Sequence, residues 1–102
     1  MNWLGKLLPP APPLNDEEAM RQVQRDGDHA AFAGLLRRWE APIQRLCTRM
    51  TDDEHLGEDL AQEAFARVFA CRQQFQDGKK FSTWLWQIAI NLCRDNGRRD
   101  PL

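Results

Sequence analysis

The chain has 102 residues, an apolar fraction of 42% and a formal net charge of -1. A chain of this length supports one small hydrophobic core and no second domain, and at near-neutral net charge any affinity for nucleic acid must come from local clusters of basic residues. No segment approaches the run of about 20 apolar residues that a membrane-spanning helix needs, so the composition excludes membrane insertion.

Residues 1–14 contain the run LPPAPPL and are expected to form a flexible, proline-rich leader. Asn15 and Glu18 have the spacing of a capping box, which predicts a short helix that ends at Gly27. The next helix can be capped by Asp28. Its apolar positions recur at helical spacing on one face, at Phe32, Leu35, Leu36, Trp39, Ile43, Leu46, Cys47 and Met50.

Pro42 lies inside this second helix and is expected to kink or interrupt it, because its ring meets the carbonyl of Arg38. Thr51 and Glu54 have the spacing of a second capping box, which predicts the start of a third helix. This helix is expected to end near Phe75. Its apolar face comprises Leu56, Leu60, Ala61, Ala64, Phe65, Val68 and Phe69.

A turn is predicted at Gln76 to Lys80, centred on Asp77 and Gly78. It is followed by a last helix, for which helical spacing predicts the buried residues Phe81, Trp84, Leu85, Ile88, Ala89 and Leu92. Strand patterns and repeats are missing from the sequence. The predicted fold is therefore all-α, a small bundle of three main helices plus a short N-terminal helix.

The third helix has a polar strip, formed by Asp59, Gln62, Glu63 and Ala66, that the core does not explain. One interpretation is a solvated face with its carboxylates placed favourably in the helix dipole. The other is a binding surface for a basic partner. Charge is segregated along the chain, because the stretch from Asp52 to Glu63 has no Lys or Arg, whereas basic residues dominate from Lys79 to Arg99.

The last helix carries a second apolar line, Trp86, Ile90 and Cys93, with polar residues between them. A small bundle is not expected to bury both apolar lines of this helix. Trp86 can belong to a broad buried face, or it can be an exposed aromatic ring on which an unpaired base stacks.

Three cysteines, Cys47, Cys71 and Cys93, occur singly, which argues against a disulfide framework and favours a reducing cytoplasm. They are expected to be packing residues. His29 and His55 form no zinc motif, and no Ser-His-Asp set or Gly-rich phosphate loop occurs. The sequence thus predicts neither an enzyme nor a bound metal or cofactor.

The segments EDLAQEAFARVF and FSTWLWQIAINLCRDNGRR resemble conserved region 2 of bacterial sigma factors, in particular the extracytoplasmic-function group. That group has the approximate pattern DLxQExFxRxW followed by FxTWLxRIAxNxxxDxxR. Both motifs occur in the family's order and spacing, and the resemblance extends from Ala19 to Arg99. It implies a helical domain that docks on the clamp helices of the largest RNA polymerase subunit and that recognises and melts the minus-ten promoter element.

The resemblance also implies roles for individual residues. Asp59, Gln62 and Glu63 match the polymerase-contacting positions, and the loop from Phe75 to Phe81 matches the loop that accepts a base flipped from the non-template strand. Gln87 departs from the family, which usually has Arg there. The implied DNA-binding set is Phe75, Gln76, Asp77, Lys79, Lys80, Trp86, Gln87, Asn91, Arg94, Arg98 and Arg99.

An anti-sigma factor is a further partner that the resemblance implies. Residues 15–100 are expected to form the region 2 domain, and residues 101–102 the start of a linker to a promoter-binding domain that is missing from the chain, which favours an excised fragment over a natural one-domain protein. Two other functions stay open on the sequence: a helical adaptor that binds only protein, and a compact DNA-binding repressor. The start of the last helix, FSTWLW, disfavours the repressor, because a recognition helix should be polar and basic there.

Overall fold

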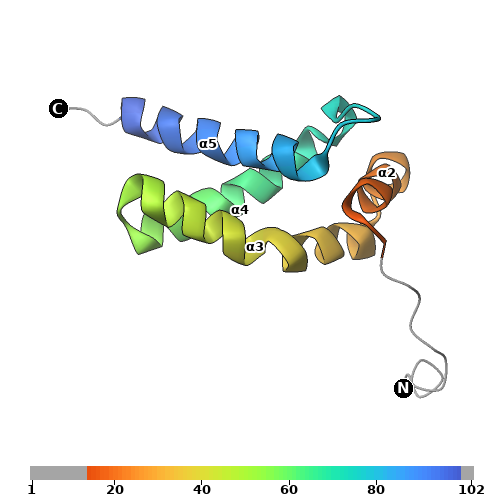
Figure 1. The fold of residues 1–102 in the computed structure, drawn as a ribbon, viewed down its shortest axis with the longest axis horizontal. Coiled ribbons are helices and arrows are strands. Elements are labelled where there is room, and N and C mark those ends of the chain that lie inside the picture. Colours follow the sequence, from red (N-terminus) through yellow and green to blue (C-terminus); the bar gives the residue numbers. More distant parts are fainter. Residues whose placement is uncertain (1–13, 100–102) are drawn as a thin grey trace, which may run out of the picture.

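The computed structural model describes residues 14–99, and the side chains of residues 14–97. Within that range there is no strand, so the predicted all-α bundle with three main helices and a short N-terminal helix is confirmed (Figure 1). The predicted leader, residues 1–14, lies outside the described residues except for Leu14. The elements are α2 (Asp16–Asp26), α3 (His29–Thr51), α4 (Glu54–Ala70), the 3-10 turn η1 (Arg72–Gln74) and α5 (Phe81–Arg99).

The first helix begins and ends, and the second helix begins, where the local sequence predicts. The Asn15 side chain accepts a hydrogen bond from the backbone N–H of Glu18 at 2.8 Å, and the Glu18 carboxylate accepts one from the N–H of Asn15 at 3.0 Å. Gly27 ends α2 with φ 61°, the left-handed conformation that glycine adopts without strain. Asp28 then caps α3 by accepting from the N–H of Ala31 at 3.1 Å. The predicted capping box and both helix boundaries are confirmed.

The predicted capping box at Thr51 and Glu54 is wrong. Thr51 is the last residue of α3, and its hydroxyl donates to the carbonyl of Cys47 at 2.8 Å. Asp52 turns the chain in a left-handed conformation with φ 55°, and Asp53 caps α4 by accepting from the N–H of Leu56 at 3.0 Å. Aspartate tolerates both roles because its short carboxylate bonds to nearby backbone groups, so two residues suffice for this connection.

Two expectations about helix continuity are also corrected. The helix α3 runs from His29 to Thr51 with Pro42 inside it, so the interruption allowed for at this proline does not occur. In contrast, α4 ends at Ala70 and not near Phe75. After the 3-10 turn, Phe75 has an extended backbone with φ -70° and ψ 122°, so the segment that leads into the predicted turn is not helical.

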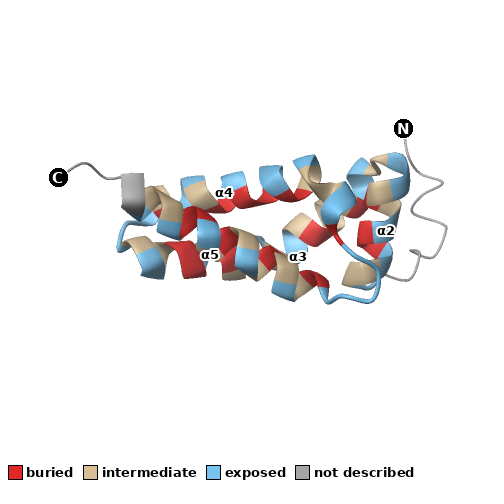
Figure 2. Ribbon diagram, turned by 90° about the horizontal axis from the view of Figure 1, so that it is seen from above, coloured by how far each residue is buried: buried red, intermediate tan, exposed pale blue. Residues whose placement is uncertain are grey.

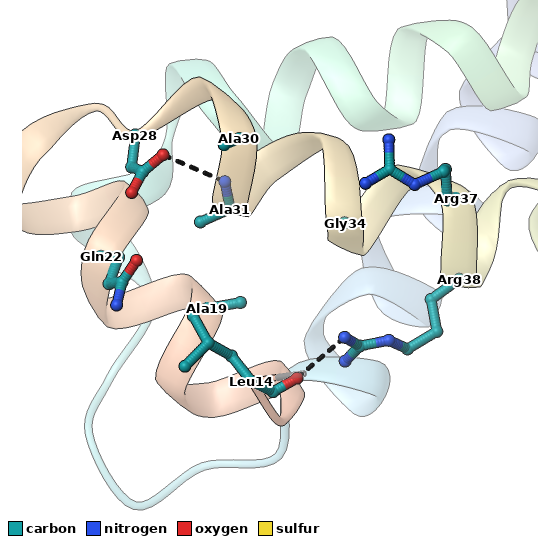
Figure 3. Close-up of a pocket in the computed structure, with 9 residues that line it drawn as sticks. All are labelled: Leu14, Ala19, Gln22, Asp28, Ala30, Ala31, Gly34, Arg37 and Arg38. Atoms are coloured by element: carbon teal, nitrogen blue, oxygen red, sulfur yellow. Dashed lines mark hydrogen bonds between the residues drawn. The ribbon is translucent and has the colours of Figure 1, made fainter. Parts of the chain in front are cut away.

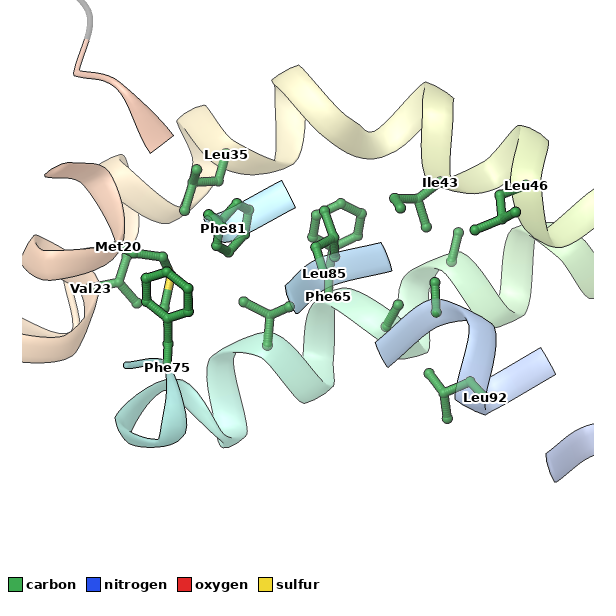
Figure 4. Close-up of a cluster of buried hydrophobic side chains, with 14 of the residues drawn as sticks. Met20, Val23, Leu35, Ile43, Leu46, Phe65, Phe75, Phe81, Leu85 and Leu92 are labelled. Atoms are coloured by element: carbon green, nitrogen blue, oxygen red, sulfur yellow. The ribbon is translucent and has the colours of Figure 1, made fainter. Parts of the chain in front are cut away.

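The core is formed by apolar side chains from all four helices and from the loop before α5. Figure 2 shows the buried positions along the inner faces of the helices, and Figure 4 shows the side chains that meet there. Met50 was predicted to belong to this core but is 43% exposed at the end of α3. The largest fully buried side chains are Phe81, Met20, Leu35, Ile43, Leu85, Val23, Val68 and Cys47.

The second apolar line of α5 is buried only in part, in agreement with the expectation that the bundle cannot bury both lines. Cys93 is buried, and Trp86 and Ile90 are half-buried against the core. The Trp86 ring packs edge-on against Trp39 of α3, with ring centroids 6.4 Å apart. Trp39 is itself held by a 3.0 Å hydrogen bond from its Nε1 to Asp16 of α2. The buried face of α5 is wide because this helix packs on both α3 and α4.

Two of the three cysteines lie inside the bundle, Cys47 on α3 and Cys93 on α5, whereas Cys71 is half-buried. Burial, together with a hydrogen bond and the charge of Cys93, raises the pKa of the Cys47 thiol from 9.0 to about 12. A protonated, buried thiol is a poor nucleophile. The prediction that these two cysteines are packing residues agrees with their positions.

The helices α3 and α4 approach each other closely at Gly57, which is buried. A Cβ atom at this position would lie 2.7 Å from the backbone N and Cα of Thr48. We therefore expect Gly57→Ala to lower the free energy of unfolding by about 1–3 kcal/mol in urea denaturation, because the two helices must separate. Gly34→Ala on α3 is the control. Its Cβ would meet nothing within 4 Å, so the better helix propensity of alanine should stabilise this variant. Equal losses in both variants would contradict the close approach.

Candidate functional site

The loop between α4 and α5 is anchored at two aromatic residues and exposed between them. Phe75 is 7% exposed and Phe81 is fully buried, whereas the residues from Gln76 to Lys80 are exposed. We call this exposed segment the loop tip. The N–H of Lys79 donates to the carbonyl of Gln76 at 3.2 Å, and Gly78 has φ 83°. The predicted turn is therefore confirmed, and Gly78 supplies the positive φ that this turn requires.

A pocket of about 480 Å³ lies beside the loop tip. Its apolar wall includes Phe75 and Trp84, whose ring centroids are 5.2 Å apart at an interplanar angle of 46°. Amide side chains and two ammonium groups complete its lining. A planar aromatic ligand could stack in such a pocket and donate or accept hydrogen bonds at its edge. The lining residues are Gln74, Phe75, Gln76, Lys79, Lys80, Thr83, Trp84 and Gln87.

Five of the eleven DNA-binding residues implied by the resemblance line this pocket: Phe75, Gln76, Lys79, Lys80 and Gln87. Asp77 is in the loop tip but lines a different pocket, together with residues of α2.

Along α5, Gln87 leads from the pocket to Asn91. The Gln87 amide nitrogen donates to the Asn91 side-chain oxygen at 3.1 Å, and Arg94 is exposed further along the helix. These three side chains follow one another at spacings of four and three residues and so share a face of α5. The side chains of Arg98 and Arg99 lie outside the described part of the structure.

Sequence reasoning missed three residues of the pocket: Gln74, Thr83 and Trp84. It assigned Trp84 wholly to the core, whereas the structure leaves the side chain half-buried with part of it in the pocket. The signal was present, because Gln87 follows Thr83 by four residues and Trp84 by three, which places all three on one helical face. Trp86 does not line the pocket and packs against Trp39 instead.

The polar strip on α4 is open to solvent. Asp59, Gln62 and Glu63 are all exposed. Glu63 forms a 3.4 Å ion pair with Arg67 one turn later, with side-chain exposures of 56% and 48%. An ion pair this exposed contributes little to stability.

A larger pocket, of about 640 Å³, lies between α2 and α3 (Figure 3). It is lined by residues that include Gln22, Gly34 and Arg37, and by none of the site residues predicted from the sequence. Arg38 crosses its edge and donates to the carbonyl of Leu14 at 2.8 Å. At the edge of this pocket, the start of α2 is therefore held against α3.

Among residues 14–97, no group of three or more His, Cys, Asp and Glu side chains is placed to hold a metal ion. None of the described helices combines the length and apolar character needed to cross a membrane.

Comparison with known proteins gives consistent matches. The family described as Sigma-70 region 2 matches residues 35–100. The chain is 41% identical over 83 residues to the ECF RNA polymerase sigma factor SigW of Bacillus subtilis, covering 81% of this chain and 44% of that protein. It is 36% identical over 90 residues to the RNA polymerase sigma-H factor of Pseudomonas aeruginosa, covering 84% and 46%. The chain thus spans about half the length of the curated relatives it matches.

A solved structure matches over most of its length. It is the NMR structure of an engineered region 2 of sigmaE in complex with GTAAAA, with a TM-score of 0.77 and 33% sequence identity. The match covers 87% of this chain and 96% of that one.

Proposed function

Because the chain belongs to the extracytoplasmic-function sigma factors, as their region 2, we propose that it docks on the RNA polymerase core and recognises and melts the minus-ten promoter element during transcription initiation. The domain comprises residues 15–100 and acts in the cytoplasm, where the polymerase is. An anti-sigma factor as its regulator belongs to the same proposal and rests on the family alone.

The observation that carries the proposal is the pocket beside the loop tip. Flipping a base out of the duplex costs a few kcal/mol of stacking, which a protein must offset with stacking and hydrogen bonds of its own. The half-buried ring of Trp84, backed by the buried ring of Phe75, offers the stacking surface, and Gln76 and Gln87 offer groups that can bond to a base edge. The similar engineered region 2 of sigmaE was solved in complex with GTAAAA.

We assign the remaining residues by their surroundings. Lys79 and Lys80 are exposed at the pocket and attract the phosphate next to the flipped base, beside Asp77 in the loop tip. Asn91, paired with Gln87, reads a neighbouring base edge. Arg94, Arg98 and Arg99 bind phosphates. Trp86 contributes less directly, because its ring packs on Trp39 and holds α5 in position.

For the polymerase partner, we propose that Asp59, Gln62 and Glu63 contact the clamp helices of the largest subunit. Their exposure supports this role, as does their chemistry, because carboxylates form strong, charge-assisted hydrogen bonds with arginine. The core does not need these side chains, so the surface is available for docking.

The base-reading assignment predicts different effects for two exposed residues of α5. The measurement is selection from single strands with a randomised six-nucleotide core, followed by titration of the selected strand at several salt concentrations. Asn91→Ala should flatten the selected sequence preference by about 1–3 kcal/mol at one position. Arg94→Ala should weaken all sequences alike and lower the salt dependence by about one phosphate contact, because phosphates carry no base identity.

Duplex of the selected sequence is the comparison ligand in the same titration. Preference for duplex would support a repressor, and binding to neither strand nor duplex would support a protein adaptor. Loss of sequence preference in Arg94→Ala but not in Asn91→Ala would show that the two roles are assigned the wrong way round.

A further inference from the structure

We infer that helix α2 determines base selectivity by holding both ends of the loop tip through Gln24 and Glu17. No described side chain of α2 lines the pocket beside the loop tip. The inference rests on the proposed function of the pocket. In Figure 1, α2 lies at the same end of the molecule as the loop between α4 and α5. The match to the Sigma-70 region 2 family begins only at residue 35, after α2 has ended.

The first anchor is Gln24, a half-buried residue of α2. Its side-chain nitrogen donates two hydrogen bonds of 2.8 Å each, one to the carbonyl of Arg72 and one to that of Phe75. A third hydrogen bond joins the same segments, because the side-chain nitrogen of Gln73 donates to the backbone carbonyl of Gln24 at 2.7 Å. Gln24 therefore fixes the backbone immediately before the loop tip, at the residue whose ring forms one wall of the pocket.

The second anchor is Glu17, which lies two turns before Gln24 on the same face of α2. Its carboxylate accepts a 2.8 Å hydrogen bond from the backbone N–H of Phe81, the first residue of α5. This contact caps α5 from a different helix and satisfies an N–H that has no partner within α5. The negative charge of Glu17 also interacts favourably with the positive end of the α5 dipole. Glu17 therefore fixes the backbone immediately after the loop tip.

Held at both ends, the loop tip has a defined position relative to α5. This matters because the pocket is formed by both: Phe75, Gln76 and Lys79 come from the loop, whereas Trp84 and Gln87 come from α5. Hydrogen bonds weaken steeply with misalignment. A shift of the loop against α5 would therefore weaken edge contacts that distinguish bases more than it would weaken stacking, which every base provides.

The test compares Gln24→Glu with Gln22→Glu in the full chain. Both change one glutamine on α2 to a carboxylate, and therefore alter the net charge equally. Gln24→Glu removes the two N–H donors and places a carboxylate against two carbonyl oxygens. Gln22 is also half-buried but lines the pocket between α2 and α3. Each variant is used in the selection from randomised single strands, and its thermal midpoint is measured.

We expect Gln24→Glu to reduce the enrichment of the preferred base at one position by about tenfold, the loss of one well-aligned edge contact, while Gln22→Glu keeps the wild-type preference. A role in stability alone would lower the thermal midpoint and weaken all sequences by the same factor, with no change in preference. That result in folded Gln24→Glu would overturn the inference and leave the proposed function standing. A wild-type chain that selects no sequence would overturn both.

Glu17 gives a second and milder test, which decides the matter if Gln24→Glu does not fold. Glu17→Ala removes the acceptor for the Phe81 N–H and should reduce the same base preference. Glu17→Gln retains a side-chain oxygen that can accept this bond, so the preference should be largely restored. Equal, wild-type preference in both Glu17 variants would show that the anchor has no effect on base reading.

Discussion

Replacing Phe65 with alanine is expected to lower the free energy of unfolding by about 3–5 kcal/mol, because a large aromatic side chain is removed from a packed interior. Phe65 is 3% exposed on α4 and belongs to the buried cluster, near the middle of which Figure 4 places it. Small domains are stable by only about 5–15 kcal/mol. The variant should therefore be partly unfolded under mild denaturing conditions, which urea denaturation followed by circular dichroism would measure.

The control for this experiment is Phe69→Ala on the same helix. Phe69 is half-buried and touches His29 and Phe32 at the edge of the core, so the same atoms are deleted where solvent can fill part of the space. Its loss of stability should be clearly smaller. Equal effects at the two positions would mean that Phe65 is not in the centre of the core.

Reversing the charge of Asp59 and Glu63 together, by substitution with lysine, is expected to abolish binding to RNA polymerase core. The proposed interface is electrostatic, and truncating one partner of a buried charge pair costs about 2–5 kcal/mol, so reversal of two charges should weaken the affinity by about a hundredfold or more. Helicity should not change, because both side chains are exposed on α4. Co-purification with core polymerase and circular dichroism measure the two outcomes.

Asp26→Lys is the matched control for the Glu63→Lys part of this double change. Asp26 pairs with Arg25 as Glu63 pairs with Arg67, and both pairs are largely exposed, so each change reverses one charge and breaks one surface ion pair. Asp26→Lys should bind polymerase normally. Wild-type affinity in the double variant Asp59→Lys, Glu63→Lys would refute the docking surface proposed on α4.

The candidate site was predictable where it depends on spacing within one helix, and less so in the loop. The exposure of Asp59, Gln62 and Glu63 follows from the period of α4. The turn at Asp77 and Gly78 follows from residue type. The aromatic wall of the pocket could not be predicted in this way. Phe75 follows a 3-10 turn after α4, and its ring meets that of Trp84 in the next helix, α5. Trp86 was ambiguous until its contact with Trp39 was known.

The sequence by itself determined which segments are helical, the caps at Asn15 and Asp28, and most of the core, because these depend on hydrogen bonds and apolar spacings within a few residues along the chain. The tertiary structure decided how the loop tip is held. The hydrogen bonds from Gln24 to the loop and from Phe81 to Glu17 join residues 48 to 64 positions apart. Contacts at this separation form only when the bundle packs, and no local pattern in the sequence indicates which side chains will meet.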